Sequence, residues 1–299
     1  MSETLAAIKR KISMAGELQG VVRTMKALAA SNIAHYENSV RSLVDYDRTI
    51  NLGLCVCFRS GERTPGGPEK PARDPQRSVT GAIIFGSDQG LVGQFNDIVA
   101  DHAAEFLAAL PGRKVVWAIG ERIHARLDIA GFAPKGLFAV PDSVGAITQL
   151  VSQIQIEAEL HREEGVYDEV YVFHNRMQSG LLYAPARRRL LPLDNAWRRS
   201  LAAQPWPSAM IPEVFGTTAE ALTALIREHL FIVLFRACAE SLACENATRL
   251  AAMQRADKNI DEMLGNLGAA FRRVRQSGID AELFDVIAGF EALTKKITR

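Results

Sequence analysis

Two long runs without proline, one near each end of the chain, constrain the fold more than any other feature. The first covers residues 2–57 and the last covers residues 217–299. Both are longer than an ordinary globular helix, and both carry apolar residues at three- and four-residue steps. We therefore expect two long amphipathic helices, one at either end of a 299-residue chain.

The first run has a seven-residue repeat made of two series of positions, which together form the seam of a coiled-coil strand. The series are Ile8, Ala15, Val22, Ala29, Tyr36, Leu43 and Ile50, and, offset by three, Leu5, Ile12, Gln19, Lys26, Ile33, Val40, Asp47 and Leu54. The seam weakens at Gln19 and Lys26, where Leu18 and Met25 come one residue earlier. Such drift is expected when a helix of 3.6 residues per turn is read in sevens.

The last run begins with Thr217 and Glu220, which have the spacing of a capping box. A helix that continues to residue 299 would be roughly 120 Å long. It is the longer of the two, so an antiparallel pair would leave its tip, from about Arg273 onward, without a partner in the chain. The tip nevertheless carries an apolar stripe, which implies that another protein surface covers it. The stripe comprises Ile279, Leu283, Val286, Ile287, Phe290 and Leu293.

The segment between the runs alternates between strand and helix patterns. We expect strands over residues 79–85, 115–119, 137–140, 169–174 and 187–193, and helices over 97–110, 121–130 and 144–164. Alternation of this kind predicts an α/β domain with a mainly parallel, Rossmann-like sheet. The expected fold class is thus α/β plus a long antiparallel coiled coil.

The domain boundaries follow from these patterns. We expect a coiled coil from residues 1–58 and 212–299, an α/β domain over 78–195 and a connecting loop over 196–211. Residues 59–77 are rich in proline, glycine and charge, which is typical of a linker.

Composition excludes several classes of function. The formal net charge is +1, so no strong global field attracts nucleic acid or a membrane surface. No apolar run approaches the ~18 residues of a membrane span, and no signal peptide is visible, so we expect a cytoplasmic protein without membrane insertion. Six scattered histidines and four cysteines with C-x-C and C-x5-C spacing form no standard metal pattern. We expect reduced, packed thiols and no metal or other cofactor.

The turn at residues 86–93 (GSDQGLVG) follows a strand and precedes a helix, the position of a phosphate-binding loop. Its glycine spacing is neither G-x-G-x-x-G nor a Walker loop. A tight turn that needs glycine is the structural alternative to nucleotide binding, and Asp88 is either a helix N-cap or a catalytic carboxylate. The cluster of Arg187, Arg188 and Arg189 lacks interleaved aromatics, which favours a strand edge or a protein contact over nucleic acid.

Four segments in order resemble the γ subunits of F-type ATP synthases. They are residues 21–31 (VVRTMKALAAS), 86–96 (GSDQGLVGQFN), 240–253 (ESLACENATRLAAM) and 275–282 (RQSGIDAE). The second is similar to that family's S-D-x-G-L-C-G-x-F-N turn, with Val92 where Cys is common. The last resembles R-Q-x-x-I-T-x-E, with Asp280 in place of threonine. The linker at 59–77 and the tail at 294–299 depart from the family pattern and suggest a variant branch.

The resemblance implies a rotor shaft that binds no nucleotide and carries torque from a membrane c-ring to a hexamer of α and β subunits. The α/β domain would then be the foot, which contacts the ε subunit and the c-ring on the cytoplasmic face of the membrane. Two alternatives remain at this point: a nucleotide-binding α/β enzyme that uses the 86–93 turn, and a coiled-coil scaffold unrelated to ATPases.

The resemblance also assigns roles to individual residues. Met25, Arg249, Arg275, Gln276 and Glu282 match positions of the family that contact the β subunit. The tip stripe, namely Ile279, Leu283, Val286, Phe290 and Leu293, would turn in a bearing at the far end of the hexamer.

Overall fold

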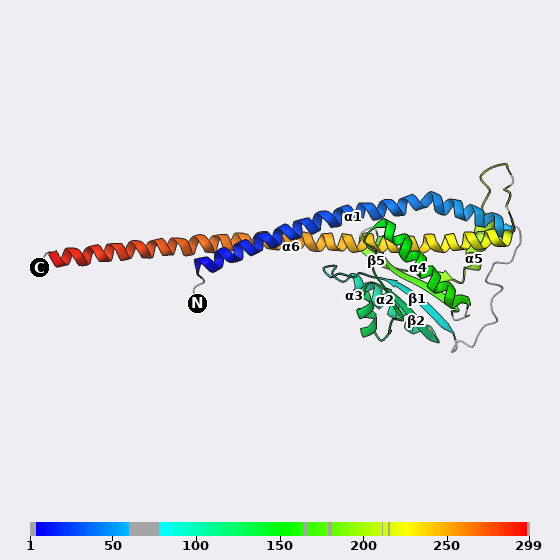
Figure 1. Ribbon diagram of the computed structural model, residues 1–299, viewed down its shortest axis with the longest axis horizontal. Helices are drawn as coiled ribbons and strands as arrows, with labels where there is room; N and C mark the ends of the chain where they lie inside the picture. Colours follow the sequence, from blue (N-terminus) through cyan, green and yellow to red (C-terminus); the bar gives the residue numbers. More distant parts are fainter. Residues whose placement is uncertain are drawn as a thin grey trace. The chain divides into compact units, whose positions relative to one another are not determined.

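The computed structural model describes residues 4–59, 78–163, 167–178, 181–210, 212–214 and 216–297 (Figure 1). The chain divides into two compact units. We call the first, Met1–Leu28 with Leu250–Arg299, the helical unit, and the second, Ala29–Arg249, the α/β unit.

Both long helices predicted from the sequence are present. Helix α1 spans Leu5–Arg59 and helix α6 spans Thr218–Ile297. The capping box is formed, because Glu220 N–H donates to Thr217 Oγ1 over 3.3 Å while Thr217 Oγ1 donates to the Glu220 carboxylate over 2.8 Å. The predicted linker falls on residues 60–77, which lie outside the described residues, and Arg59 belongs to α1.

In the helical unit the two helices pair antiparallel, as expected. Gln19 contacts Asp261 and Lys26 contacts Asp257, so residue numbers rise on one helix as they fall on the other. The apolar seam is buried at every heptad position of the first series that lies in this unit, and α6 contributes two further buried residues. The relative exposures are Ile8 1%, Ala15 7%, Val22 6%, Met253 3% and Ile260 6%.

The α/β unit contains a five-stranded sheet in the order β3-β2-β1-β4-β5. Its strands are β1 (Val79–Phe85), β2 (Arg113–Ile119), β3 (Gly136–Phe138), β4 (Glu169–Gln178) and β5 (Leu181–Leu191). The pairs β1–β2, β1–β4 and β2–β3 are parallel, whereas β4–β5 is an antiparallel hairpin. The mainly parallel, Rossmann-like sheet is therefore confirmed, with one antiparallel edge strand.

Helices cover both faces of this sheet. Helices α2 (Phe95–Ala109) and α3 (Glu121–Ile129) pack on one face, where the core contains Ala82, Ile84 and Phe173. The other face, with Ile83, Phe85 and Val172, packs against α4 (Val144–Glu163) and the parts of α1 and α6 in this unit. Alternate residues of β1 thus enter different cores, as the two-residue period of a strand requires.

Two elements differ from the sequence analysis. Strand β5 begins at Leu181, six residues before the expected start, and the segment expected to be a connecting loop at 196–211 contains most of helix α5 (Asn195–Ala203). The N-cap of α5 is Asp194, whose carboxylate accepts a hydrogen bond from Ala196 N–H over 2.9 Å. Trp197 and Leu201, one turn apart, pack α5 against α1 and the start of α6, so burial of this apolar face stabilises a helix too short to persist alone.

Candidate interaction surfaces

The tip of α6 exposes a broad apolar surface. Among the α6 residues whose side chains the structure describes, the last half-buried one is Val274, and every residue from Arg275 to Ala288 is exposed. Figure 1 shows α6 continuing past the first turn of α1, within the same unit. The exposed large side chains in this stretch are Ile279 55%, Leu283 58%, Phe284 69%, Val286 69% and Ile287 46%.

Three of the five predicted tip residues are thus placed at the surface: Ile279, Leu283 and Val286. Phe290 and Leu293 lie on α6, but outside the residues whose side chains the structure describes. The sequence analysis missed Phe284, because it lies away from the stripe on the helix circumference. A large aromatic residue in a segment without a partner helix is the feature of the sequence that could have indicated it. With Phe284 included, the apolar surface is wider than one stripe.

The predicted contact residues near the tip are exposed as well. Arg275, Gln276 and Glu282 all lie on the unpaired part of α6 and face solvent. Met25 is different, because it is half-buried in the seam of the helical unit, where it packs with Val22, Met253 and Ile260. A contact of Met25 with another protein would therefore involve the exposed remainder of its side chain.

Polar residues interrupt the seam of the helical unit at one level. Lys26 Nζ donates to Asp257 Oδ2 over 2.7 Å, and Arg23 Nε donates to Asp257 Oδ1 over 3.2 Å. Gln19 Nε2 reaches both Asp257 and Asp261. The hydrogen bond from Lys26, and then that from Arg23, lower the pKa of Asp257. Gln19 and Lys26 therefore keep their seam positions, while Leu18 is 54% exposed.

Arg249, predicted to contact the β subunit, is engaged within its own helix. Its guanidinium donates to Glu245 Oε1 over 2.6 Å, and the side chains of Arg249 and Glu245 are 13% and 7% exposed. Burial raises the pKa of Glu245, and the neighbouring Arg249 partly offsets that rise. A partner's carboxylate would therefore have to share or replace Glu245.

The 86–93 turn is held together by its own polar groups. Ser87 is fully buried, its N–H donates to Asn96 Oδ1 over 3.0 Å, and Asn96 Nδ2 donates to Ser87 Oγ over 2.8 Å. The Asp88 carboxylate accepts from Glu121 N–H and Val140 N–H, each over 2.9 Å. Glu121 is the first residue of α3, so Asp88 does cap a helix, although not the helix that directly follows the turn.

Apolar side chains fill the space where a nucleotide would bind in a doubly wound sheet. Strand order reverses between β1 and β4, and ligands of such folds bind beyond the carboxyl ends of the strands at this point. Here a buried cluster joins Val92 and Phe95, which follow β1, to Cys244 of α6, and Tyr183 packs against it. A β-carbon on Gly86 would lie 2.3 Å from Ile123 Cβ, so there is no room for a side chain at Gly86. The close-packed turn therefore opposes the nucleotide-binding alternative.

The other candidate sites of the sequence do not form a binding centre in the described residues. Arg187 stacks on the Phe106 ring at 3.7 Å, and Arg189 lies near Glu169 and Asp194, at 4.0 and 3.9 Å. All four cysteines, Cys55, Cys57, Cys238 and Cys244, are buried thiols. Among the described residues, no group of three or more His, Cys, Asp or Glu side chains could hold a metal ion.

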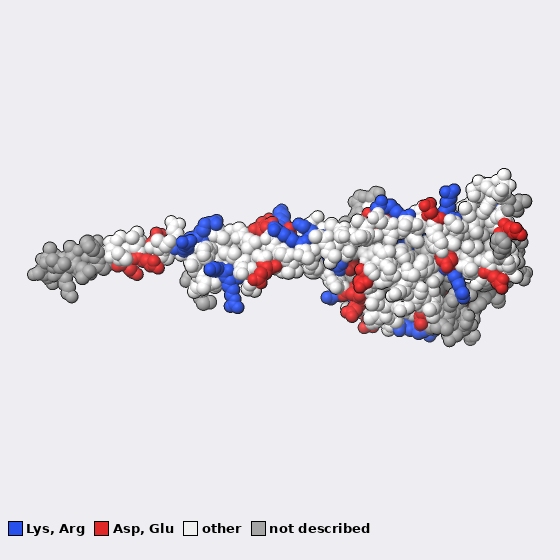
Figure 2. All heavy atoms as spheres, turned by 45° about the horizontal axis from the view of Figure 1, so that its top comes forward, with Lys and Arg blue, Asp and Glu red and all other residues white. Residues whose placement is uncertain are grey.

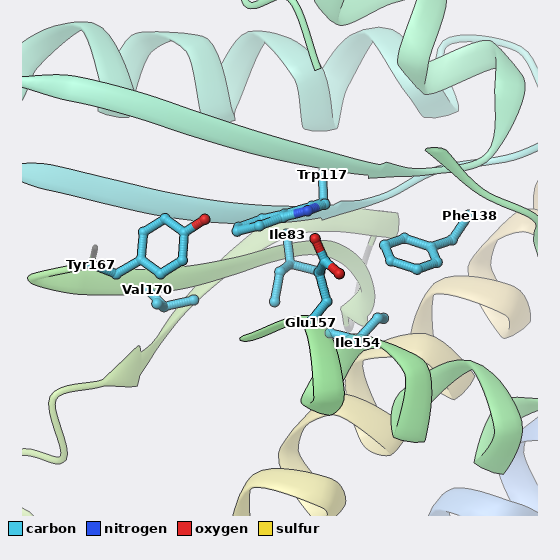
Figure 3. Close-up of a pocket in the computed structure, with 7 residues that line it drawn as sticks. All are labelled: Ile83, Trp117, Phe138, Ile154, Glu157, Tyr167 and Val170. Carbon is cyan, nitrogen blue, oxygen red and sulfur yellow. The ribbon is translucent and has the colours of Figure 1, made fainter. Parts of the chain in front are cut away.

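Two hollows of the α/β unit are candidate ligand sites. The first lies between the sheet and α4, with Trp117, Tyr167 and Glu157 in its wall (Figure 3). Its free volume is about 10 Å³, enough for one water molecule. The second is larger and more open, and Arg198 and Arg199 line it. On the face seen in Figure 2, basic and acidic side chains are interspersed, in agreement with a net charge of +1.

No helix in the described ranges combines the length and apolarity that crossing a bilayer demands.

Comparison with known proteins agrees with the resemblance found in the sequence. The model of the ATP synthase family matches residues 4–293. An ATP synthase gamma chain from Syntrophus aciditrophicus is 28% identical over 303 residues, which cover 97% of this chain and 99% of the relative.

Solved structures with the same fold come from mitochondrial ATP synthases. The rotor of the Euglena gracilis enzyme matches with a TM-score of 0.58 and 14% identity, over 92% of this chain and 98% of that one. The central stalk of the Tetrahymena thermophila enzyme matches with a TM-score of 0.54 and 17% identity, over 79% and 99%. Because the family model spans nearly the whole sequence, this chain belongs to the ATP synthase family and, within it, to the γ chains.

Proposed function

We propose that this chain is the central rotor shaft of a rotary ATP synthase, which transmits torque between a membrane c-ring and a catalytic hexamer of α and β subunits. The observation that carries the proposal is the unpaired end of α6, with its five exposed large apolar side chains. A free-standing protein gains nothing from such a surface, whereas burial of each side chain in a partner contributes roughly 1.5–3 kcal/mol.

The chemistry of the tip suits a bearing. Apolar contacts are non-directional, so a shaft can turn against an apolar sleeve without breaking oriented hydrogen bonds at every step. The polar residues Arg275, Gln276 and Glu282 lie on the same exposed segment, and their directional contacts would give the β subunits a preferred angular position. Rotation then shifts the populations of β conformers by differential contact.

The partners follow from this role. The tip meets the α and β subunits, and the α/β unit meets the ε subunit and the c-ring, with proton or sodium flow as the source of torque. The chain is then peripheral, on the cytoplasmic face of the membrane. Met25 and Arg249 are the proposed contacts with β on the paired part of the helices. Contact of Arg249 with β requires that the partner share or replace the ion pair of Arg249 with Glu245.

The chain itself is not an enzyme in this proposal. The polar side chains of Ser87 and Asp88 in the 86–93 turn are already hydrogen-bonded to Asn96, Glu121 and Val140. Apolar side chains occupy the place of a nucleotide. Equilibrium binding of ATP or NAD to the purified chain distinguishes the enzyme alternative. Saturable binding, or hydrolysis at about 1 per second, the range of true enzymes, would favour an enzyme over a shaft.

Hydrogen exchange tests the shaft directly. Amides of residues 279–293 should exchange fast in the free chain and slowly after assembly with α and β subunits. Leu283→Ser combined with Val286→Ser should reduce coupled ATP hydrolysis by the assembled complex. Ile129→Ser is the matched control, since Ile129 is 79% exposed on α3. Equal exchange in both states would show that the tip does not enter the hexamer. Failure to co-purify with α, β and ε would favour an unrelated coiled-coil scaffold.

A further inference from the structure

A second hollow in the α/β unit has the chemistry of an anion site. It has a free volume of about 440 Å³ and is lined by Phe58, Asn195, Arg198, Arg199 and Ala202. We call it the arginine hollow. Its α5 residues follow one another at steps of three, one and three, so they share one face of the helix. Phe58, near the end of α1, forms the other wall.

The fold holds this face of α5 in place. On the opposite side of α5, Leu201 is buried and Trp197 packs edge-on against Phe58, with ring centroids 6.2 Å apart. Arg59 of α1 donates to the carbonyl oxygens of Ala202 and Gln204. The Arg59 side chain therefore links the C-terminal end of α5 to α1, and the wall of the hollow is preorganised.

Two neighbouring guanidinium groups at the hollow have no counter-charge in the described residues. Arg198 donates to Asn195 Oδ1 over 3.4 Å and lies 5.1 Å above the Phe58 ring. Its Nε is buried without a hydrogen-bond partner in the part of the chain that the structure describes. Arg199 donates to the Asn195 carbonyl oxygen over 3.3 Å.

Several other arginines of this unit are paired with carboxylates. Arg126 lies 2.8 Å from Asp97 and from Asp101, and Arg236 lies 3.2 Å from Asp47. Arg198 and Arg199 form no such ion pair with any described carboxylate. Two adjacent like charges repel each other, and a bound anion would relieve that repulsion while pairing the free donors.

We propose that the arginine hollow binds a phosphate group. Guanidinium presents several donors in a planar fork that matches the oxygens of phosphate, and the bonds are charge-assisted. The volume of the hollow lies within the range of small-ligand sites. An acidic protein segment is the weaker fit, because it needs an extended basic surface rather than a concave site flanked by one aromatic wall. The same chemistry serves a soluble phosphate compound and an anionic lipid headgroup.

The test uses the purified full-length chain and three kinds of probe. Calorimetric titration with inorganic phosphate and pyrophosphate measures binding of soluble anions. Co-sedimentation with phosphatidylglycerol vesicles, against vesicles of phosphatidylcholine alone, measures binding of headgroups. A glutamate-rich peptide represents an acidic protein partner.

Saturable binding of at least one phosphate probe is expected. Combining Arg198→Gln with Arg199→Gln should weaken it by about tenfold or more, because each charge-assisted bond contributes ~1.5 kcal/mol or more. The control combines Arg113→Gln with Arg122→Gln, which removes the same charge from two exposed residues outside the hollow and should leave affinity within about twofold. Circular dichroism of both variants confirms folding.

The result also identifies the source of the phosphate group. Binding of pyrophosphate without vesicle binding indicates a soluble ligand, and vesicle binding alone indicates a headgroup. No saturable binding of any phosphate probe, equal loss in the control, or binding of the peptide alone would overturn the proposal. Because these measurements use the free chain, their outcome is independent of whether the chain serves as a shaft.

Discussion

Lys26 Nζ lies 2.7 Å from Asp257 Oδ2, so a basic residue in the seam of α1 is paired with a carboxylate of α6. Asp257 is only 14% exposed and also contacts Arg23 and Gln19. Polar residues at seam positions specify the register of a coiled coil at some cost in stability. This cluster therefore selects one alignment of the two helices over alignments shifted by a heptad.

A double-mutant cycle should detect this pairing. Lys26→Ala and Asp257→Ala are expected to destabilise the chain non-additively, with a coupling that decreases as salt is raised. Thermal melts followed by circular dichroism at two salt concentrations give the coupling. The pair Lys258 and Glu262, 79% and 66% exposed at 4.0 Å, is the control and should show almost none. Additive effects at Lys26 and Asp257 would mean that the cluster does not set the register.

The ion pair of Arg249 and Glu245 predicts that Arg249→Ala weakens the free subunit. Removal of one member of a buried pair leaves an unpaired charge, at a cost of about 3 kcal/mol. Urea denaturation of the free chain measures the loss. Replacing both residues with alanine should restore much of it, because no charge is then left unpaired.

The same double variant separates stability from partner contact. If Arg249 contacts the β subunit, the assembled complex should stay impaired even when both residues are alanine. Full recovery of ATP hydrolysis and coupling in the double variant would assign Arg249 to the stability of its own helix.

The glycines of the chain should respond to alanine in opposite directions. Gly86→Ala would place a methyl group 2.3 Å from Ile123 Cβ and should cost about 1–3 kcal/mol or more by overpacking. Gly16→Ala, with nothing within 4 Å, should stabilise α1 by up to ~1 kcal/mol. The urea midpoints of the two variants test this. A neutral Gly86→Ala variant would show that the turn can open.

His229 predicts a loss of stability in acid. Burial, and then the charge of Arg188, lower the pKa of His229 from 6.5 to about 4. The unfolded chain therefore binds a proton between pH 6.5 and 4 that the folded chain does not. The contribution of neutral His229 to the free energy of unfolding is fully present above pH 6.5. It is lost as pH falls towards 4, by up to ~3 kcal/mol. His229→Gln should reduce the change of the urea midpoint with pH over this range. If the midpoint of the variant changes with pH as much as that of the native chain, other groups cause the dependence.

The fold could be predicted from the sequence where periodicity and chain continuity agree. Strand β1 has the expected limits of residues 79–85, and the first heptad series is buried from Ile8 to Tyr36. Both patterns repeat over many residues, so one exception does not obscure them. At residues 86–93 the sequence favours a tight turn that needs glycine over a nucleotide site, because the glycines lack phosphate-loop spacing.

Other elements depend on contacts that no local pattern contains. Strand β5 includes Pro185, which normally argues against a strand and is accommodated here because β5 is an edge strand. Helix α5 was missed although Asp194 and the apolar pair of Trp197 and Leu201 could have indicated a capped, amphipathic helix. The sequence motif at 240–253 does not reveal that Arg249 pairs with Glu245, although a spacing of four residues places the two on one helix face.

Because its four cysteines are buried, the native chain should react little with thiol-directed dyes. Maleimides react with thiolates, and burial raises the pKa of Cys244 to about 12 and that of Cys238 as well. Cys55 and Cys57 are at most 1% exposed. A single cysteine introduced at an open position such as Ile129 can therefore carry a dye while all four natural cysteines stay in place. Individual rotors could then be observed turning without first rebuilding the core of the protein.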